Sequence, residues 1–108
     1  HLWSNHSPMR VLSLVCLLLV TAACSRFADL QKNGTVDEKY AAAMSYYAKG
    51  GKGYYKAGLL FEEIIPLIQG KGEEGEKAQF FAAYCKYHQG LYLESAASFQ
   101  KFYQTFGR

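Results

Sequence analysis

Two stretches of the chain decide its fold: residues 54–68, YYKAGLLFEEIIPLI, and residues 92–106, YLESAASFQKFYQTF. Their apolar and small residues share the offsets 0, 3, 4, 7, 10, 11 and 14 from the first tyrosine of each stretch. These positions are Tyr54, Ala57, Gly58, Phe61, Ile64, Ile65 and Ile68 in the first stretch, and Tyr92, Ser95, Ala96, Phe99, Phe102, Tyr103 and Phe106 in the second. Steps of three and four residues follow one face of an α-helix, and the small pair one turn in lets a neighbouring helix approach closely. The pattern predicts two equivalent amphipathic helices.

Two further helical stretches precede these, at about 38–49 and 73–88. Glycines lie between the stretches, where a chain reversal needs positive φ or extra freedom: Gly50, Gly51 and Gly53, then Gly70, Gly72 and Gly75, then Gly90. Pro66 falls near the end of its helix, where it ends or bends the element. The expected fold is therefore all-α, with two antiparallel helix pairs at 38–68 and 73–106.

The two matched helices begin 38 residues apart, because 92 minus 54 is 38. The stretches 53–61 and 90–99 resemble the second-helix signature of the tetratricopeptide (TPR) family, in which an aromatic, a small residue and another aromatic follow a glycine turn. That family repeats about every 34 residues. The resemblance implies a right-handed solenoid of helix pairs, and two unrelated amphipathic helices are the alternative. Because solenoids generally need three or more repeats, we expect the sequence to be truncated at its carboxy end.

The amino-terminal part has the pattern of an export signal. Met9 and the cationic Arg10 precede an apolar run, and small residues follow up to Cys24. The run is shorter than the roughly 20 apolar residues that span a membrane. We expect residues 1–8 to be upstream and non-native, and residues 9–23 to form a signal peptide that is removed.

Residues 20–24, VTAAC, resemble the lipobox of bacterial lipoproteins. The resemblance implies cleavage between Ala23 and Cys24, a diacylglycerol thioether on Cys24, and an acyl chain such as palmitate on the new amino terminus. Thr21 departs from the leucine usual there, and an ordinary secretory signal that leaves Cys24 free is the alternative. Residues 24–37 are expected to form a polar linker. Ser25, which is not Asp, favours the outer membrane.

Cys85 has no predicted disulfide partner. Cys16 leaves with the signal peptide, and Cys24 is blocked if it carries lipid. A histidine or cationic partner that would activate the Cys85 thiol is not evident in the sequence. We therefore expect it to be a small buried hydrophobe and not a reactive thiol.

The whole pattern resembles the amino-terminal part of the BamD family, the lipoproteins of the outer-membrane β-barrel assembly machinery. The most distinctive portions are residues 60–66 and 83–87. The resemblance implies a location on the periplasmic face of the outer membrane, attached through the lipid. It implies three kinds of partner: a BamA-like barrel protein, other assembly-machinery lipoproteins and unfolded outer-membrane protein precursors. Another periplasmic TPR lipoprotein that acts as a cell-envelope scaffold is the alternative.

Five residues on the first helices of each pair are candidates for a peptide-binding groove, because they lie off the matched stripes. They are Tyr40, Tyr47, Gln79, Phe80 and Tyr87. The alternative for each is a place in the core between repeats.

Several other classes of function lack support in the sequence. A net charge of +3, with basic and acidic residues interspersed, makes no basic stripe for nucleic acid. His88 has no second ligand or base at metal or triad spacing, so we expect it to act as a helix-terminal cation. Adjacent pairs such as Glu62 and Glu63 diverge around a helix and cannot flank one bond. We expect no enzyme activity, metal or cofactor apart from the covalent lipid; an active site in a missing carboxy-terminal part stays open.

Overall fold

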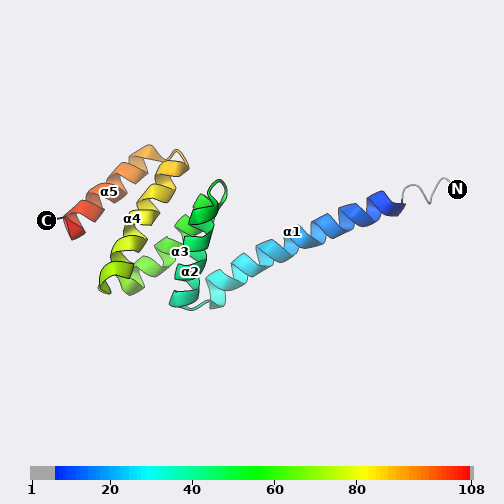
Figure 1. Ribbon diagram of the computed structural model, residues 1–108, viewed down its shortest axis with the longest axis horizontal. Coiled ribbons are helices and arrows are strands. Elements are labelled where there is room, and N and C mark those ends of the chain that lie inside the picture. Colours follow the sequence, from blue (N-terminus) through cyan, green and yellow to red (C-terminus); the bar gives the residue numbers. More distant parts are fainter. Residues whose placement is uncertain (1–6, 108) are drawn as a thin grey trace. The chain divides into compact units, whose positions relative to one another are not determined.

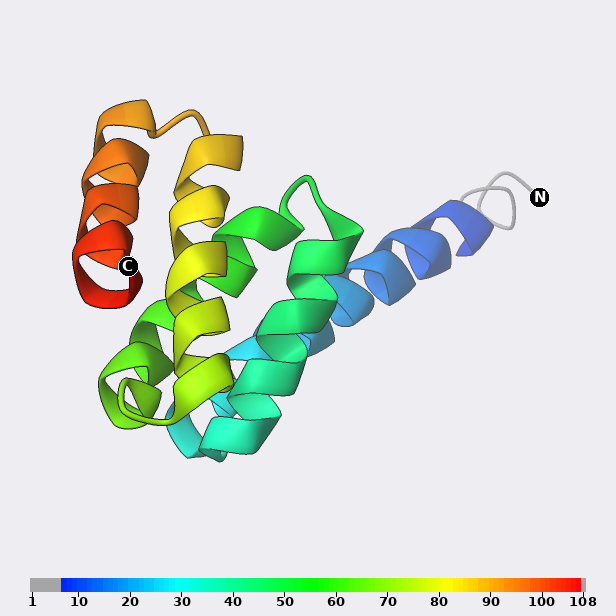
Figure 2. The same ribbon diagram turned by 60° about the vertical axis from the view of Figure 1, so that its left-hand side comes forward.

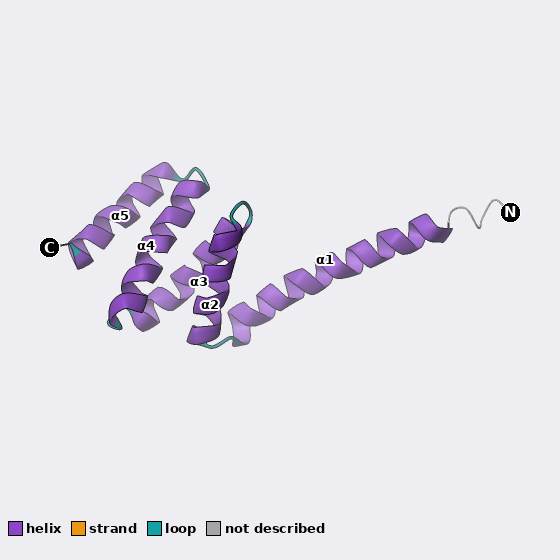
Figure 3. Ribbon diagram, viewed as in Figure 1, coloured by secondary structure: helices purple, strands orange, loops and turns teal. Residues whose placement is uncertain are grey.

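A computed structural model describes residues 7–107, without the side chains of residues 7–9 and 19–24 (Figure 1). The helices are α1 (Ser7–Asn33), α2 (Val36–Lys49), α3 (Gly53–Ile68), α4 (Gly72–His88) and α5 (Tyr92–Phe106). The described residues contain helices and loops and no strand (Figure 3). The prediction of an all-α fold is confirmed, and the four helices expected after residue 37 lie within two residues of their predicted bounds.

The chain divides into two units, residues 1–33 and residues 34–108. The described part of the first unit is α1, whose apolar residues between Val11 and Leu18 are exposed. In the part of the chain that the structure describes, no helix is both long and apolar enough to cross a membrane.

Most of residues 24–37, the expected polar linker, are helical. Helix α1 continues through it to Asn33, so Gly34 and Thr35 are its only residues outside helices. The reason is local: residues 24–33 contain neither glycine nor proline and include several good helix formers. The Asn33 side-chain amide also donates to Asp29 Oδ1, one turn back, at 2.8 Å.

Helix α2 begins two residues earlier than expected because a capping box fixes its first turn. Thr35 Oγ1 accepts from the Glu38 backbone N–H at 3.1 Å, and Glu38 Oε1 accepts from the Thr35 backbone N–H at 2.9 Å. The two residues thereby satisfy two backbone N–H groups that a helix start leaves unpaired. Gly50, with φ of +68°, ends the helix in a conformation that favours glycine.

In the second unit, α2 to α5 follow one another side by side, and each runs opposite to the one before (Figure 2). The small residues of the α3 stripe lie where helices meet. Ala57 is fully buried, and a Cβ added to Gly58 would stand 3.4 Å from Cys85 Cβ on α4. Pro66 does not end α3, which continues for two more residues.

The core of this unit lies around α3. That helix supplies the large buried side chains Leu60, Phe61, Ile64 and Ile68, while α2 and α4 contribute mostly small residues. Helix α3 packs against both α2 and α4, whereas α5 packs on α4 among the described helices. The matched stripe of α5 therefore stays largely uncovered, and Ser95 is the buried residue of that helix.

Candidate functional site

Aromatic side chains join the helices of the second unit through one chain of ring contacts. Phe81 of α4 lies 4.7 Å from Tyr47 of α2 and 6.1 Å from Phe61 of α3, measured between ring centroids. Tyr40 meets the edge of Phe61 at 6.3 Å. The two groove candidates on α2, Tyr40 and Tyr47, are therefore half-buried rings that pack between helices.

Burial also sets the chemistry of Tyr47. It raises the pKa of the phenol above its ordinary value, and the nearby Cys85, Tyr54 and Tyr84 add to the effect. The Tyr47 hydroxyl therefore stays protonated at neutral pH and keeps its capacity to donate a hydrogen bond.

His88 occupies the last turn of α4, as its sequence position predicted, but its ring lies among tyrosines. It stacks on Tyr54, and the edges of Tyr47 and Tyr87 face it with centroids 6.2 and 5.7 Å away. Within the described residues, no group of three histidine, cysteine or acidic side chains is placed to hold a metal ion. The contacts of His88 connect the end of α4 to the start of α3.

The two aromatic candidates on α4 present ring surface to solvent. Phe80 is 38% exposed and Tyr87 is 49% exposed. Tyr84 lies between them, 4.9 Å from Phe80 and 6.3 Å from Tyr87, and Tyr92 of α5 lies 5.4 Å beyond Tyr87. We call these four residues, Phe80, Tyr84, Tyr87 and Tyr92, the aromatic face.

Sequence reasoning missed two members of the aromatic face. Tyr84 completes the steps of four and three residues that connect Phe80 to Tyr87, so helical spacing could have included it. Tyr92 was assigned to the packed stripe of its helix, whereas it is 63% exposed. The spacing of apolar residues along one helix cannot show whether another helix packs against that face.

Gln79 does not belong with the aromatic candidates. It is 8% exposed, and it lines a groove with Glu62 of α3, Lys86 of α4 and Ser98 of α5. Gln79 and Phe80 are adjacent on α4, so their side chains leave the helix about 100° apart. The expected single groove is therefore divided between two faces of α4.

The predicted lipidation and cleavage residues, Cys24 and Ala23, lie outside the described side chains. Cys85 is fully buried, as predicted. Burial raises the pKa of its thiol to about 12, with a smaller contribution from the negative charge of Glu62. Because the thiolate is the reactive form, Cys85 is inert at neutral pH.

Comparisons with family models, curated proteins and solved structures found no match to this chain. Its function is therefore inferred from the chemistry of its own residues.

Proposed function

We propose that this chain is part of an outer-membrane lipoprotein of the BamD type, a component of the β-barrel assembly machinery. In this proposal it has no enzymatic activity and works as a scaffold. Its partners are a BamA-like barrel protein, the other lipoproteins of the machinery and unfolded outer-membrane protein precursors. The observation that carries the proposal is the aromatic face, a continuous row of partly exposed rings on two successive antiparallel helices.

The chemistry of the aromatic face suits an unfolded barrel strand. Such strands alternate apolar and polar residues and carry aromatic rings at both ends of the apolar band. Exposed tyrosines bury large ring surfaces against an apolar side chain while their hydroxyls bond to backbone groups. Tyr87 and Tyr92 each offer an exposed ring surface and a hydroxyl group, and their rings are neighbours.

The finer architecture belongs to the same proposal. The pairs α2 with α3 and α4 with α5 are two TPR-type units of a right-handed solenoid, in keeping with the 38-residue spacing of their second helices. Residues 9–23 are its lipoprotein signal peptide, and Cys24 carries the lipid on the periplasmic side of the outer membrane. Two lipid attachments give a stable anchor, whereas a single acyl chain binds only marginally.

The partner is tested by affinity isolation of the full-length protein from solubilised membranes. Recovery of a barrel protein with amino-terminal periplasmic repeats supports the assembly role. Recovery of cell-wall enzymes without such a barrel protein would instead support the alternative, a scaffold for other cell-envelope work.

The aromatic face is tested with a strand peptide of alternating aromatic and polar residues, whose fluorescence anisotropy reports binding to the full chain. Tyr87→Ala is expected to weaken binding about tenfold, as loss of a central aromatic contact does. Tyr55→Ala is the matched control, because Tyr55 is 59% exposed and lies on α3 outside the aromatic face. Equal losses for both variants would contradict the assignment of this face.

A further inference from the structure

A second feature of the molecule is a groove on another side of α4. It encloses about 370 Å³, within the range of small-ligand and peptide sites. Gln79, Ala82 and Lys86 of α4 form its floor, and side chains of α3 and α5 form its two walls. We call it the polar groove.

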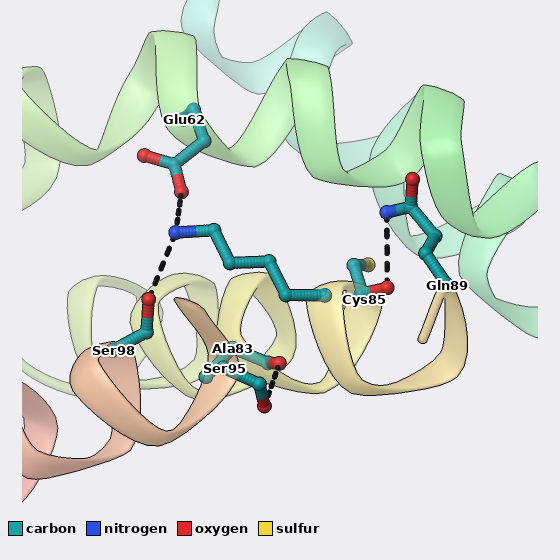
Figure 4. Close-up of polar contacts among 7 residues, drawn as sticks. Glu62, Ala83, Cys85, Gln89, Ser95 and Ser98 are labelled. Carbon is teal, nitrogen blue, oxygen red and sulfur yellow. Dashed lines mark hydrogen bonds and ion pairs between the residues drawn. The ribbon is translucent and has the colours of Figure 1, made fainter. Parts of the chain in front are cut away.

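One lysine connects the two walls of the polar groove. Lys86 Nζ lies 3.2 Å from Glu62 Oε1 on α3 and donates a hydrogen bond to Ser98 Oγ on α5 at 2.8 Å. Figure 4 shows the Glu62 carboxylate and the Ser98 hydroxyl on opposite sides of one nitrogen atom, which dashed lines join to both. Ser95 Oγ donates to the buried Ala83 carbonyl oxygen at 2.9 Å and fixes α5 on α4 nearby (Figure 4). The groove is therefore held open in one shape before anything binds, which lowers the entropic cost of binding.

Gln79 gives the polar groove an unused binding capacity. More than nine-tenths of this residue is buried, yet no described residue forms a hydrogen bond with its side chain. Its amide nitrogen and oxygen are not among the fully buried side-chain atoms that lack a partner, so both stay accessible from the groove. Because Gln79 lines the groove, a bound molecule can supply the missing partner.

The chemistry of the groove indicates what that molecule is. A glutamine side chain offers one acceptor and two donors, which match the N–H and C=O groups of a peptide unit. The charged lining residues balance, with Glu62 and Glu94 against Lys86 and Lys101, so the groove does not favour a simple anion or cation. Ile65 and Ala97 add apolar surface on the two walls, next to the small side chain of Ala82 on the floor.

We propose that the polar groove binds an extended segment of another polypeptide. One peptide unit of that segment pairs with the Gln79 amide, and a small apolar side chain lies against Ile65 and Ala97. Basic and acidic side chains of the segment face Glu94 and Lys101. This site is separate from the aromatic face, and it does not depend on the assembly role proposed above.

The probe is the blocked tetrapeptide acetyl-Lys-Ala-Ala-Glu-amide, titrated into the isotope-labelled full chain and followed by NMR. The side-chain amide resonances of Gln79 are expected to shift and saturate. Gln79→Leu is expected to weaken binding about tenfold, because a buried hydrogen-bonding pair is lost. Gln104→Leu is the control, because Gln104 is exposed on the same unit outside the groove. The affinity of the Gln104→Leu protein for the tetrapeptide should stay within about twofold of wild type.

A second measurement separates binding from folding. Because the Gln79 amide is accessible from the groove and bonds to no described residue, Gln79→Leu is expected to leave the thermal unfolding midpoint close to that of wild type while it loses the peptide. A lowered midpoint would show that the fold itself satisfies the amide, and this would overturn the proposal. So would the absence of saturable binding to wild type, or wild-type affinity in Gln79→Leu.

Discussion

The imidazole ring of His88 stacks on the phenol ring of Tyr54, with centroids 4.2 Å apart and ring planes 16° from parallel. Tyr54 stands in the first turn of α3 and His88 in the last turn of α4, so the contact ties together ends that 34 residues separate in the chain. It lies beside Tyr87, so it also supports one end of the aromatic face.

Removing this stack should destabilise the second unit. His88→Ala is expected to lower the free energy of unfolding by about 1 kcal/mol, the usual contribution of an aromatic pair beyond the area that it buries. Urea unfolding followed by circular dichroism measures the effect. His88→Phe keeps a ring at the position and should retain most of the stability. If alanine and phenylalanine were equally destabilising, the stacked ring would not be the cause.

Gly53 should tolerate no side chain. A Cβ there would stand only 2.2 Å from the Tyr46 backbone oxygen, so α2 and α3 would have to move apart. Gly53→Ala is expected to cost on the order of 2 kcal/mol of stability, as overpacking does. Gly70→Ala is the matched control, because nothing lies within 4 Å of its added Cβ and its φ is not positive. Denaturant midpoints of the two variants compare them directly, and similar midpoints would contradict the tight crossing.

The Cys85 thiol should make the fold less stable at alkaline pH. Its pKa is 9.0 in an unstructured chain and about 12 in the fold. Between those values the unfolded state gives up the proton first, so the free energy of unfolding falls as pH rises from about 9 to 12. Below pH 9 this stabilisation is fully present.

Cys85→Ala is expected to flatten that part of the pH profile, measured by urea unfolding at several alkaline pH values. Other groups titrate there too, so the difference between variant and wild type is the quantity that counts. Alkylation gives an independent check: at pH 8, iodoacetamide should spare the buried Cys85 until the chain unfolds. Rapid modification of Cys85 in the folded chain would contradict its burial.

The proposed anchor depends on one thiol. Cys24→Ala is expected to abolish incorporation of a radioactive fatty acid in cells that express the full-length protein, because no sulfur remains at the lipobox position. Cys16→Ala changes a cysteine within the proposed signal peptide and should leave labelling intact. Persistent labelling of the Cys24→Ala protein would remove the lipoprotein assignment.

Local features of the sequence predicted the helices well. The steps of three and four residues in 54–68 and 92–106, with glycines between them, placed each of these helices to within two residues. The start of α2 was missed because a reciprocal bond between Thr35 and Glu38 decided it. The helical conformation of residues 24–33 follows from the absence of any helix-breaking residue there.

The candidate site was predicted less completely. Sequence spacing found Phe80 and Tyr87 but grouped Gln79 with them, although it lines a different surface of α4. It also could not find the connection from Glu62 through Lys86 to Ser98, because these side chains come from three helices and meet only after packing.

The sequence by itself determined that this chain forms amphipathic helices, where most of them begin and end, and which residues share a helical face. The tertiary structure alone decided which of those faces are covered. The stripes of α3 and α5 match position for position, yet Phe61 is fully buried whereas its counterpart Phe99 is only half-buried. Periodicity is a property of one helix, whereas burial depends on its neighbours, and α3 has packed helices on two sides where α5 has one among the described residues.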